Sequence, residues 1–318
     1  MPIFYKEKNY GCIIFKPIPR LAIWGHTLVK DYFGYHDFPD GVGQAWSFSC
    51  QKGASNICET APYQGKTLLE LWQEHQELFG HPNEQFPVII SLVGPEDDLS
   101  IQVHPDVKAA LKLGYQAGKN EAWYFIEAEP GAKIVYGHNA KDEADLTHYI
   151  KEEQWDKLIR HLEVHPDDFV YLPAGLLHAL KKGSVVYEIQ QATDVTFRFM
   201  IIIVKMLKEM NVNCMYNNRL MLQQFHMFHL RRIVWLKQQL KMERGRSWYQ
   251  SEFFTVNKYE MTGKNTIVND KPFQLVTVIK GNGVINGNSV KMGDNFVVCA
   301  DQDAVEYDGT MTVMICTL

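Results

Sequence analysis

The amino-acid sequence predicts a mainly β fold, an all-β barrel architecture interrupted by short helical insertions. Two observations support this prediction. Runs of strand-forming residues alternate with turn clusters rich in Gly, Pro, Asn and Asp, and helical patterns are confined to residues 67–75, 106–113 and 144–163. Because helices do not alternate regularly with strands, barrels of β-strands are favoured over repeated βαβ units.

A weak internal repeat indicates that the β unit occurs twice. The sequence Asp-Asp-Phe-Val-Tyr-Leu-Pro-Ala at 167–174 resembles Asp-Asn-Phe-Val-Val-Cys-Ala at 294–300. With 318 residues and 46% hydrophobic content, the chain is long enough for two domains.

Composition indicates a cytoplasmic protein that binds neither nucleic acid nor membranes. The net charge is −5, the N-terminus lacks the apolar core of a secretory signal, and no run reaches the roughly 18 apolar residues of a membrane helix. The six cysteines form no Cys-x-x-Cys pair, so we expect free thiols. A monomer is compatible with the sequence.

Four residues form the most informative pattern in the chain. Gln102 and His104 are two apart in an alternating run, so in a strand both side chains point to the same face. Glu121 opens an aromatic-rich strand, and His178 follows a Pro-Ala-Gly turn that ends another strand. Taken singly, each residue is more often structural. Together they offer one amide, two imidazoles and one carboxylate, which suit zinc.

Seven sequence blocks occur in this order along the chain: Trp24-Gly25 with Leu28; Tyr63-Gln64-Gly65-Lys66-Thr67-Leu68; Gln102-Val103-His104-Pro105; Gly118-Lys119-Asn120-Glu121-Ala122-Trp123-Tyr124; Tyr136-Gly137-His138-Asn139-Ala140; Leu172-Pro173-Ala174-Gly175 with His178-Ala179; and Glu188-Ile189-Gln190-Gln191 with Asp194 and Arg198. In their content and order they resemble the type I mannose-6-phosphate isomerases, in the short form found in Gram-positive bacteria. The resemblance is dense over residues 1–199 and looser from about 251.

The resemblance implies a zinc-dependent enzyme of the cupin superfamily that interconverts mannose 6-phosphate and fructose 6-phosphate. It implies two cupin-type (jelly-roll) barrels: a catalytic one at 1–199 and a second, non-catalytic one at 251–318, joined by an atypical linker at 200–250. One Zn²⁺ per chain would be held by the family's ligand positions, which fall on Gln102, His104, Glu121 and His178. The family's catalytic arginine falls on Arg198, and Lys119 and Glu188 match positions that line its sugar pocket.

Aldose–ketose isomerisation explains why these residue types would be needed. A proton moves between C2 and C1 through an enediol while negative charge develops on the carbonyl oxygen. A metal polarises that carbonyl, and Arg198 stabilises the oxyanion because a guanidinium remains charged at any working pH. Glu188, Lys119 or a water on the metal is left as the proton shuttle. No Gly-rich phosphate loop is present, so the phosphate-binding residues are not identified.

Two other functions stay open at this point. One is a non-catalytic cupin that binds a sugar or sugar phosphate as a sensor. The other is a cupin oxygenase, which is disfavoured because Gln102 and Glu121 do not give the two-His-one-carboxylate set with the histidines spaced as iron enzymes usually have them. The family usually has a glutamate where Gln44 stands and an Ala-His-Pro-like step at Cys50-Gln51, so the N-terminal pocket wall is expected to differ.

The segment 200–246 departs from the rest of the chain. It contains seven of the twelve methionines and nine Lys or Arg against two Glu, a net charge of +7. A basic amphipathic helix for an acidic partner or membrane surface is one interpretation. We favour a shifted reading frame, because one restored T after the codon for Phe199 would yield the family pattern Phe-Tyr-Asp-Tyr-His-Arg. The hypothesis predicts that Ile201, Met227 and Trp235 are exposed and poorly packed.

Overall fold

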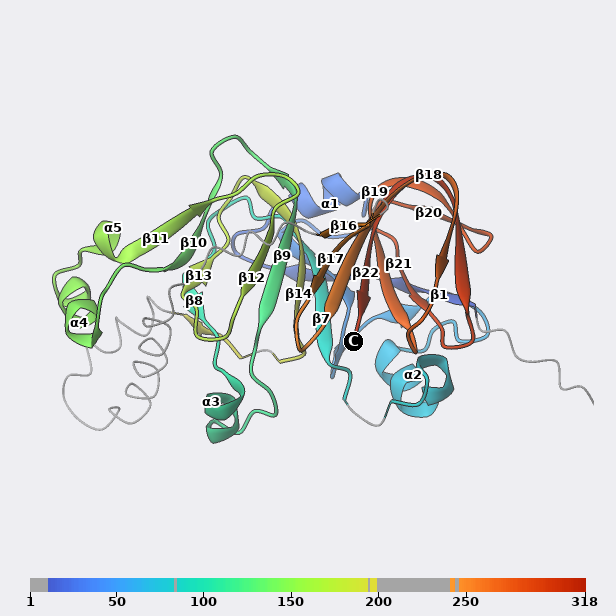
Figure 1. Cartoon of the computed structure of the whole chain (residues 1–318), viewed down its shortest axis with the longest axis horizontal. Coiled ribbons are helices and arrows are strands. Elements are labelled where there is room, and N and C mark those ends of the chain that lie inside the picture. The colour runs from blue at the N-terminus through green and yellow to red at the C-terminus, as the bar shows by residue number, and fades with distance from the viewer. Residues whose placement is uncertain (1–10, 83–84, 194, 199–240, 244–245) are drawn as a thin grey trace, which may run out of the picture.

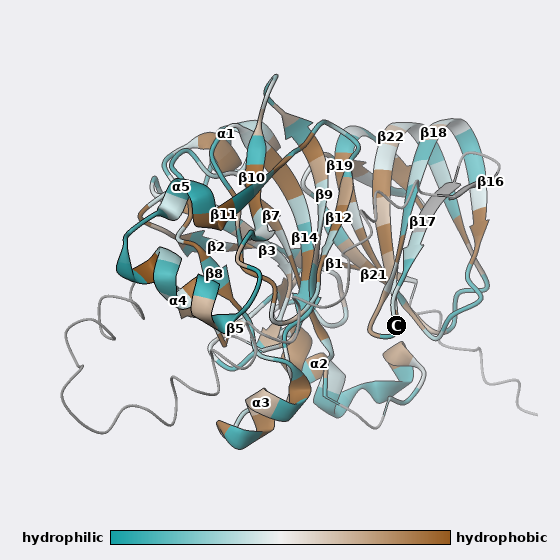
Figure 2. Ribbon diagram, turned by 60° about the vertical axis from the view of Figure 1, so that its left-hand side comes forward, coloured by the Kyte–Doolittle hydropathy of each residue, from teal (hydrophilic) through white to brown (hydrophobic). Residues whose placement is uncertain are grey.

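The structure, a computed structural model, describes residues 11–82, 85–193, 195–198, 241–243 and 246–318. It is mainly β with short helices, which confirms the mainly β part of the predicted fold class. Figure 1 shows two neighbouring lobes, one built mostly from the middle of the chain and one mostly from its C-terminal part. In both lobes hydrophobic and hydrophilic residues alternate along many strands (Figure 2), as expected for strands with one buried face.

A six-stranded antiparallel sheet forms one wall of the first lobe. Its strands lie in the order β12-β9-β14-β7-β3-β2. They are β2 (Ile18–Leu21), β3 (Val42–Phe48), β7 (Val88–Val93), β9 (Glu121–Ala128), β12 (Phe169–Leu172) and β14 (Ser184–Gln191). The β14 strand is buried along its whole length, because β9 and β7 flank it on both sides.

A five-stranded sheet in the order β11-β10-β13-β8-β15 forms the opposite wall. Its strands are β8 (Gln102–Val103), β10 (Lys133–His138), β11 (Ile159–Glu163), β13 (His178–Ala179) and β15 (Phe197–Arg198). Buried side chains from both sheets, including Trp123 and Phe125 of β9 and Ile134 of β10, belong to one hydrophobic cluster. The two sheets therefore pack face to face.

The second lobe is built on a nine-stranded sheet in the order β16-β17-β18-β22-β19-β21-β1-β6, with β20 paired to β19. Its strands are β1 (Cys12–Lys16), β6 (Ile57–Cys58), β16 (Lys241–Glu243), β17 (Arg246–Gln250), β18 (Thr255–Val268), β19 (Gln274–Ile285), β20 (Asn288–Lys291), β21 (Asn295–Val298) and β22 (Ala304–Thr317). A separate hairpin joins β4 (Cys50–Gln51) to β5 (Ala54–Ser55).

The N-terminal strand belongs to the C-terminal sheet. Ile14 of β1 pairs with Phe296 of β21, and a continuous buried cluster contains Phe48 and Tyr124 of the first lobe together with Leu275 and Val297 of the second. The two lobes thus share a core. The expected domain limits, 1–199, 200–250 and 251–318, remain a prediction.

The closed barrels that we expected are not observed among the described residues. Each of the larger sheets is an open path with an edge strand at either end, such as β12 and β2 in the six-stranded sheet. Several strands of the five-stranded sheet contain only two residues, so their ladders are limited to one or two residue pairs.

Two of the three predicted helices are confirmed. The α2 helix (Leu68–Glu74) begins at a capping box in which Thr67 and Glu70 bond each other's backbone N–H, and α3 (Val107–Lys112) begins at the Asp106 cap. The structure adds α1 (Leu28–Phe33) and a 3₁₀ helix, η1 (Gln76–Phe79), which we had not predicted.

The prediction of a third helix at 144–163 is confirmed for its first half and wrong for the rest. The chain forms α4 (Glu143–Lys151), then the single turn α5 (Trp155–Leu158), and continues as strand β11. Glu153 adopts a positive φ of 53°, which a right-handed helix does not allow, so the helical pattern is broken there. The paired β10 strand then holds the remaining residues in an extended ladder.

The three residues that the reading-frame hypothesis singles out, Ile201, Met227 and Trp235, lie outside the described residues. The hypothesis remains a prediction, which independent sequencing of the coding DNA tests. The five described cysteines are free, as expected, and Cys214 lies outside the described residues. In the described part of the chain, no helix has both the length and the hydropathy required to cross a membrane.

Candidate metal centre and sugar pocket

Gln102 and His104 point to the same side of the chain, as the alternation predicts. Gln102 lies on β8 beside His178 of β13, and its Nε2 is 3.3 Å from His178 Nε2. The His104 and His178 rings are 4.9 Å apart. Val103, between the two, points into an apolar cluster instead. Strand β8 and the residue that follows it therefore direct two polar side chains toward one point.

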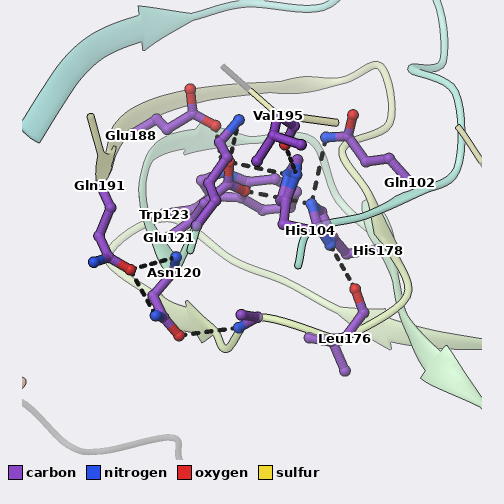
Figure 3. Close-up of polar contacts among 12 residues, drawn as sticks. Gln102, His104, Asn120, Glu121, Trp123, Leu176, His178, Glu188, Gln191 and Val195 are labelled. Carbon is purple, nitrogen blue, oxygen red and sulfur yellow. Dashed lines mark hydrogen bonds and ion pairs between the residues drawn. The ribbon is translucent and has the colours of Figure 1, made fainter. Parts of the chain in front are cut away.

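Glu121 reaches the same point from the opposite sheet, at the first residue of β9. Its Oε1 is 3.2 Å from His104 Nε2, and its Oε2 is 3.3 Å from His178 Nε2. All three side chains are about 99% buried, and the three form a group whose ligand atoms lie within 4.8 Å of one another. Figure 3 shows them converging, with the Gln102 amide at the edge.

The hydrogen bonds of the two histidines fix where their lone pairs point. Nδ1 of His104 lies 2.9 Å from the Val195 carbonyl, and Nδ1 of His178 lies 2.9 Å from the Leu176 carbonyl. A carbonyl only accepts, so both Nδ1 atoms carry hydrogen, and in the neutral rings both Nε2 atoms present lone pairs. These lone pairs face the carboxylate of Glu121.

This arrangement is the one that a metal ion would satisfy. Nε2 of His104 and Oε2 of Glu121 have no hydrogen-bond partner although both are buried. Tetrahedral zinc with ligands at about 2.1 Å separates those ligands by about 3.4 Å, close to the two contacts of Glu121. The Gln102 amide presents nitrogen to His178, and a half-turn of the amide plane would present its oxygen instead.

Burial and charge set the protonation states at the centre. Burial lowers the pKa of His104 to about 4, although Glu121 opposes this shift, so the ring is neutral near pH 7. Burial alone would raise the pKa of Glu121, but the Lys119 ammonium and His104 hold it well below its usual value. Lys119 Nζ lies 3.0 Å from Glu121 Oε1. The centre thus contains a neutral His104 imidazole and an ionised Glu121 carboxylate, the forms that bind metal.

Glu188 of β14 is the second buried carboxyl group beside the centre. Its Oε1 accepts a hydrogen bond from Trp123 Nε1 at 2.8 Å, and its Oε2 accepts one from Ser91 Oγ at 2.8 Å. Burial raises its pKa, and the nearby charge of Glu121 raises it further. A carboxyl group with a raised pKa is a better proton acceptor near neutral pH than an ordinary glutamate.

Asn120 holds the segments that carry Glu121 and His178 together. Its Oδ1 accepts hydrogen bonds from Tyr171 Oη and from the backbone of Ala174 in the turn before His178, each at 3.0 Å. Its Nδ2 donates to Gln191 at 2.7 Å (Figure 3). Sequence reasoning missed this network, and nothing in the local pattern around Asn120 indicates it.

A pocket of about 610 Å³ opens above this centre. It brings together all three predicted pocket residues, Lys119, Glu188 and Arg198, with the predicted ligands Gln102 and Glu121; His104 and His178 are not among its lining residues. The lining consists of Arg20, Leu21, Ala22, Ile23, Trp24, Gln44, Trp46, Val93, Asp98, Leu99, Ser100, Gln102, Lys119, Glu121, Trp123, Leu180, Glu188, Gln190, Thr196 and Arg198.

Arg198 lies at the pocket because of strand pairing. On β15 it is directly opposite Gln102 of β8, and its side chain is exposed. Gln44, the position where the sequence departs from the family pattern, also lines the pocket, whereas Cys50 and Gln51 are not among the lining residues. Arg20 and Trp46 line the pocket as well, and sequence reasoning identified neither of them.

Comparison with known proteins agrees with this geometry. The family model for the catalytic domain of type I phosphomannose isomerase matches residues 17–129, and that for the cupin domain of mannose-6-phosphate isomerase matches residues 239–318. The chain is 33% identical to the mannose-6-phosphate isomerase ManA of Bacillus subtilis over 305 residues, covering 90% of this chain and 92% of that protein. It is 30% identical to the mannose-6-phosphate isomerase of Streptococcus mutans, covering 92% and 93%.

Solved structures give the same result. The crystal structure of the mannose 6-phosphate isomerase from Bacillus subtilis matches with a TM-score of 0.84 and 30% identity, covering 97% of this chain and all of that one. A structure from Archaeoglobus fulgidus, at 20% identity and a TM-score of 0.70, shares the fold. Sequence, fold and pocket agree over nearly the whole chain, which therefore belongs to the type I mannose-6-phosphate isomerase family of enzymes.

Proposed function

We propose that the protein is a zinc-dependent aldose–ketose isomerase that interconverts mannose 6-phosphate and fructose 6-phosphate through an enediol. The observation that carries the proposal is the convergence of His104, Glu121 and His178 beside a pocket that Glu121 itself lines, in a chain of this family. In the proposed centre Gln102, His104, Glu121 and His178 hold one zinc ion. When bound, zinc supplies a Lewis acid that polarises the substrate carbonyl.

The chain's own residues supply the remaining chemistry. Arg198, opposite Gln102, stabilises the negative charge that develops on the substrate oxygen, because its guanidinium stays protonated and presents several donors in one plane. It does not act as a base.

Glu188 is the proposed proton shuttle between C2 and C1. Its raised pKa supports this role, and Ser91 and Trp123 hold the carboxyl group in one orientation. Lys119 is less suited to carry the proton because its ammonium is paired with Glu121. Lys119 instead keeps Glu121 ionised, and its position in the pocket lining also allows it to donate to a sugar hydroxyl.

We further propose that the two lobes are cupin-type barrels of different roles, the first catalytic and the second structural. The family match of residues 239–318 to a cupin domain supports this assignment. The position of the candidate metal group also supports it, because the one such group among the described residues lies in the first lobe. The cytoplasm remains the expected compartment, and a sugar phosphate the expected small-molecule substrate.

A coupled isomerase assay tests the proposal. Purified protein should convert mannose 6-phosphate to fructose 6-phosphate, contain about one zinc ion per chain by elemental analysis, lose activity with a chelator and regain it with zinc. A zinc-loaded protein that binds hexose phosphate without turnover would contradict the enzyme and support a sensor. Full activity after complete removal of metal would contradict the metal centre.

A further inference from the structure

One face of the six-stranded sheet forms a continuous floor from the metal centre to the far side of the pocket. Residues that pair across antiparallel strands share a face. Glu188 of β14 pairs with Ser91 of β7, which pairs with Trp46 of β3. Two residues further along the same face, Val93 of β7 pairs with Gln44 of β3. Gln44 in turn pairs with Arg20 of the edge strand β2. Arg20 on β2 is therefore three strands along the sheet from β14, which carries Glu188, and four strands from β9, which carries Glu121.

Arg20 is held in a defined position. Its guanidinium carbon lies 4.2 Å from the centre of the Trp46 ring, a cation–π contact, and Trp46 is nearly buried. The Trp46 indole N–H donates to Gln44 Oε1 at 2.9 Å, which fixes the ring in turn. The side chain is half-buried against the pocket wall, so little of its remaining freedom would be lost when it bound a ligand.

No carboxylate neutralises Arg20 among the described residues. The acidic residues of the pocket have other partners: Glu121 contacts Lys119, Glu188 accepts from Ser91 and Trp123, and Asp98 pairs with Lys181 at 3.2 Å. An oriented guanidinium with unused donors at the wall of a pocket is the arrangement that binds phosphate.

We propose that Arg20 binds the phosphate group of the sugar phosphate, so that the substrate lies across the floor with its reacting carbons at the metal centre and its phosphate at β2. The inference rests on the proposed function. It divides the pocket's two arginines between two tasks: Arg198 beside Gln102 serves the reacting end, and Arg20 serves the phosphate end.

A binding measurement tests this division without turnover. Isothermal titration of the zinc-loaded protein should detect inorganic phosphate and the non-isomerisable hexitol glucitol 6-phosphate. Arg20→Gln should weaken both by at least about tenfold, because a charge-assisted, bidentate contact is lost. Arg20→Lys should retain part of the affinity. Lys264→Gln is the matched control, because it removes the same charge from an exposed residue of the second lobe.

Arg20→Lys retains the test if Arg20→Gln does not fold, because it keeps a cation beside the Trp46 ring and loses only the planar fork of donors. It should weaken phosphate binding by a smaller factor than Arg20→Gln does. The thermal melting temperatures of both variants should stay close to that of the parent protein.

Kinetics separate a phosphate contact from a general disturbance of the pocket. Arg20→Gln should raise KM for mannose 6-phosphate by at least about tenfold with kcat changed less than about threefold. Unchanged phosphate binding in Arg20→Gln and Arg20→Lys, or its loss in Arg198→Ala alone, would overturn the inference. A protein without isomerase activity that still binds glucitol 6-phosphate through Arg20 would contradict the proposed function and support the phosphate site.

Discussion

The two lobes use the same kind of antiparallel strand but fill their interiors differently. In the first lobe, inward positions carry charged and polar residues such as His104, Glu121 and Glu188, all buried. In the second lobe the corresponding space is an apolar cluster that includes Val278, Phe296 and Ile315. Burying unpaired polar groups costs stability, whereas packing apolar ones supplies it. The first lobe therefore combines apolar clusters with a buried polar site, whereas the cluster of the second lobe is apolar.

The largest expected effect is from His178→Ala. Loss of one imidazole leaves an incomplete cage, so we expect the zinc content to fall well below one per chain and kcat/KM to fall by about 10³-fold or more. Elemental analysis and the coupled assay measure both quantities. His161→Ala, which removes an exposed histidine of the same lobe, is the control and should leave both unchanged.

Arg198→Ala should separate chemistry from metal binding. Because the guanidinium is proposed to act on charge that develops in the transition state, we expect kcat to fall by about two to three orders of magnitude with the zinc content unchanged. Steady-state kinetics beside elemental analysis provide the test. Normal turnover would rule out the role, and a lower zinc content would assign Arg198 to the support of Gln102.

Phe296→Ala should produce the opposite result in the second lobe. Phe296 is 1% exposed within the apolar cluster, so its truncation leaves a cavity and should lower the free energy of unfolding by roughly 3–5 kcal/mol. Zinc content and kcat of the folded protein should stay the same. Denaturant unfolding measures the first, and a marked fall in zinc content would contradict the division of roles between the lobes.

The smallest effect concerns an ion pair between the lobes. Lys258 Nζ of β18 lies 2.7 Å from Asp167 Oδ1, and Tyr124 also donates to that carboxylate. Burial opposes ionisation of Asp167, but the contact with Lys258 lowers its pKa below the usual value. Lys258→Met should cost under about 1 kcal/mol at neutral pH, because Asp167 is largely exposed.

The pH dependence of that ion pair follows from the direction of the Asp167 shift. A carboxyl group with a lowered pKa in the fold stabilises the protein above the pKa of the unfolded chain, near 3.8, and loses that contribution as the pH falls through the folded value. The stability difference between the parent protein and Lys258→Met should therefore shrink below about pH 4. Thermal melting at several pH values checks this, and a difference that grows on acidification would contradict it.

Much of the fold class and of the candidate site could be predicted from sequence. The features that were predicted correctly depend on neighbouring residues, and those that were not depend on pairing between distant strands. The shared face of Gln102 and His104 and the helix starts at Thr67 and Asp106 depend on residues a few positions apart, and the structure agrees with each. The helix expected over 144–163 failed because its second half satisfies both a helical and an alternating pattern, and pairing with β10 decides between them.

The sequence by itself determined the chemical types of the site and the local direction of each side chain, because backbone geometry alone sets the two-residue period of a strand and the cap of a helix. Only the tertiary structure decided which strands face one another. Glu121 meets the two histidines from the opposite sheet, Arg20 reaches the pocket through the pairing of β2 with β3, and β1 joins the C-terminal sheet through β21. Such pairings depend on the packing of the whole chain, so no local pattern encodes them.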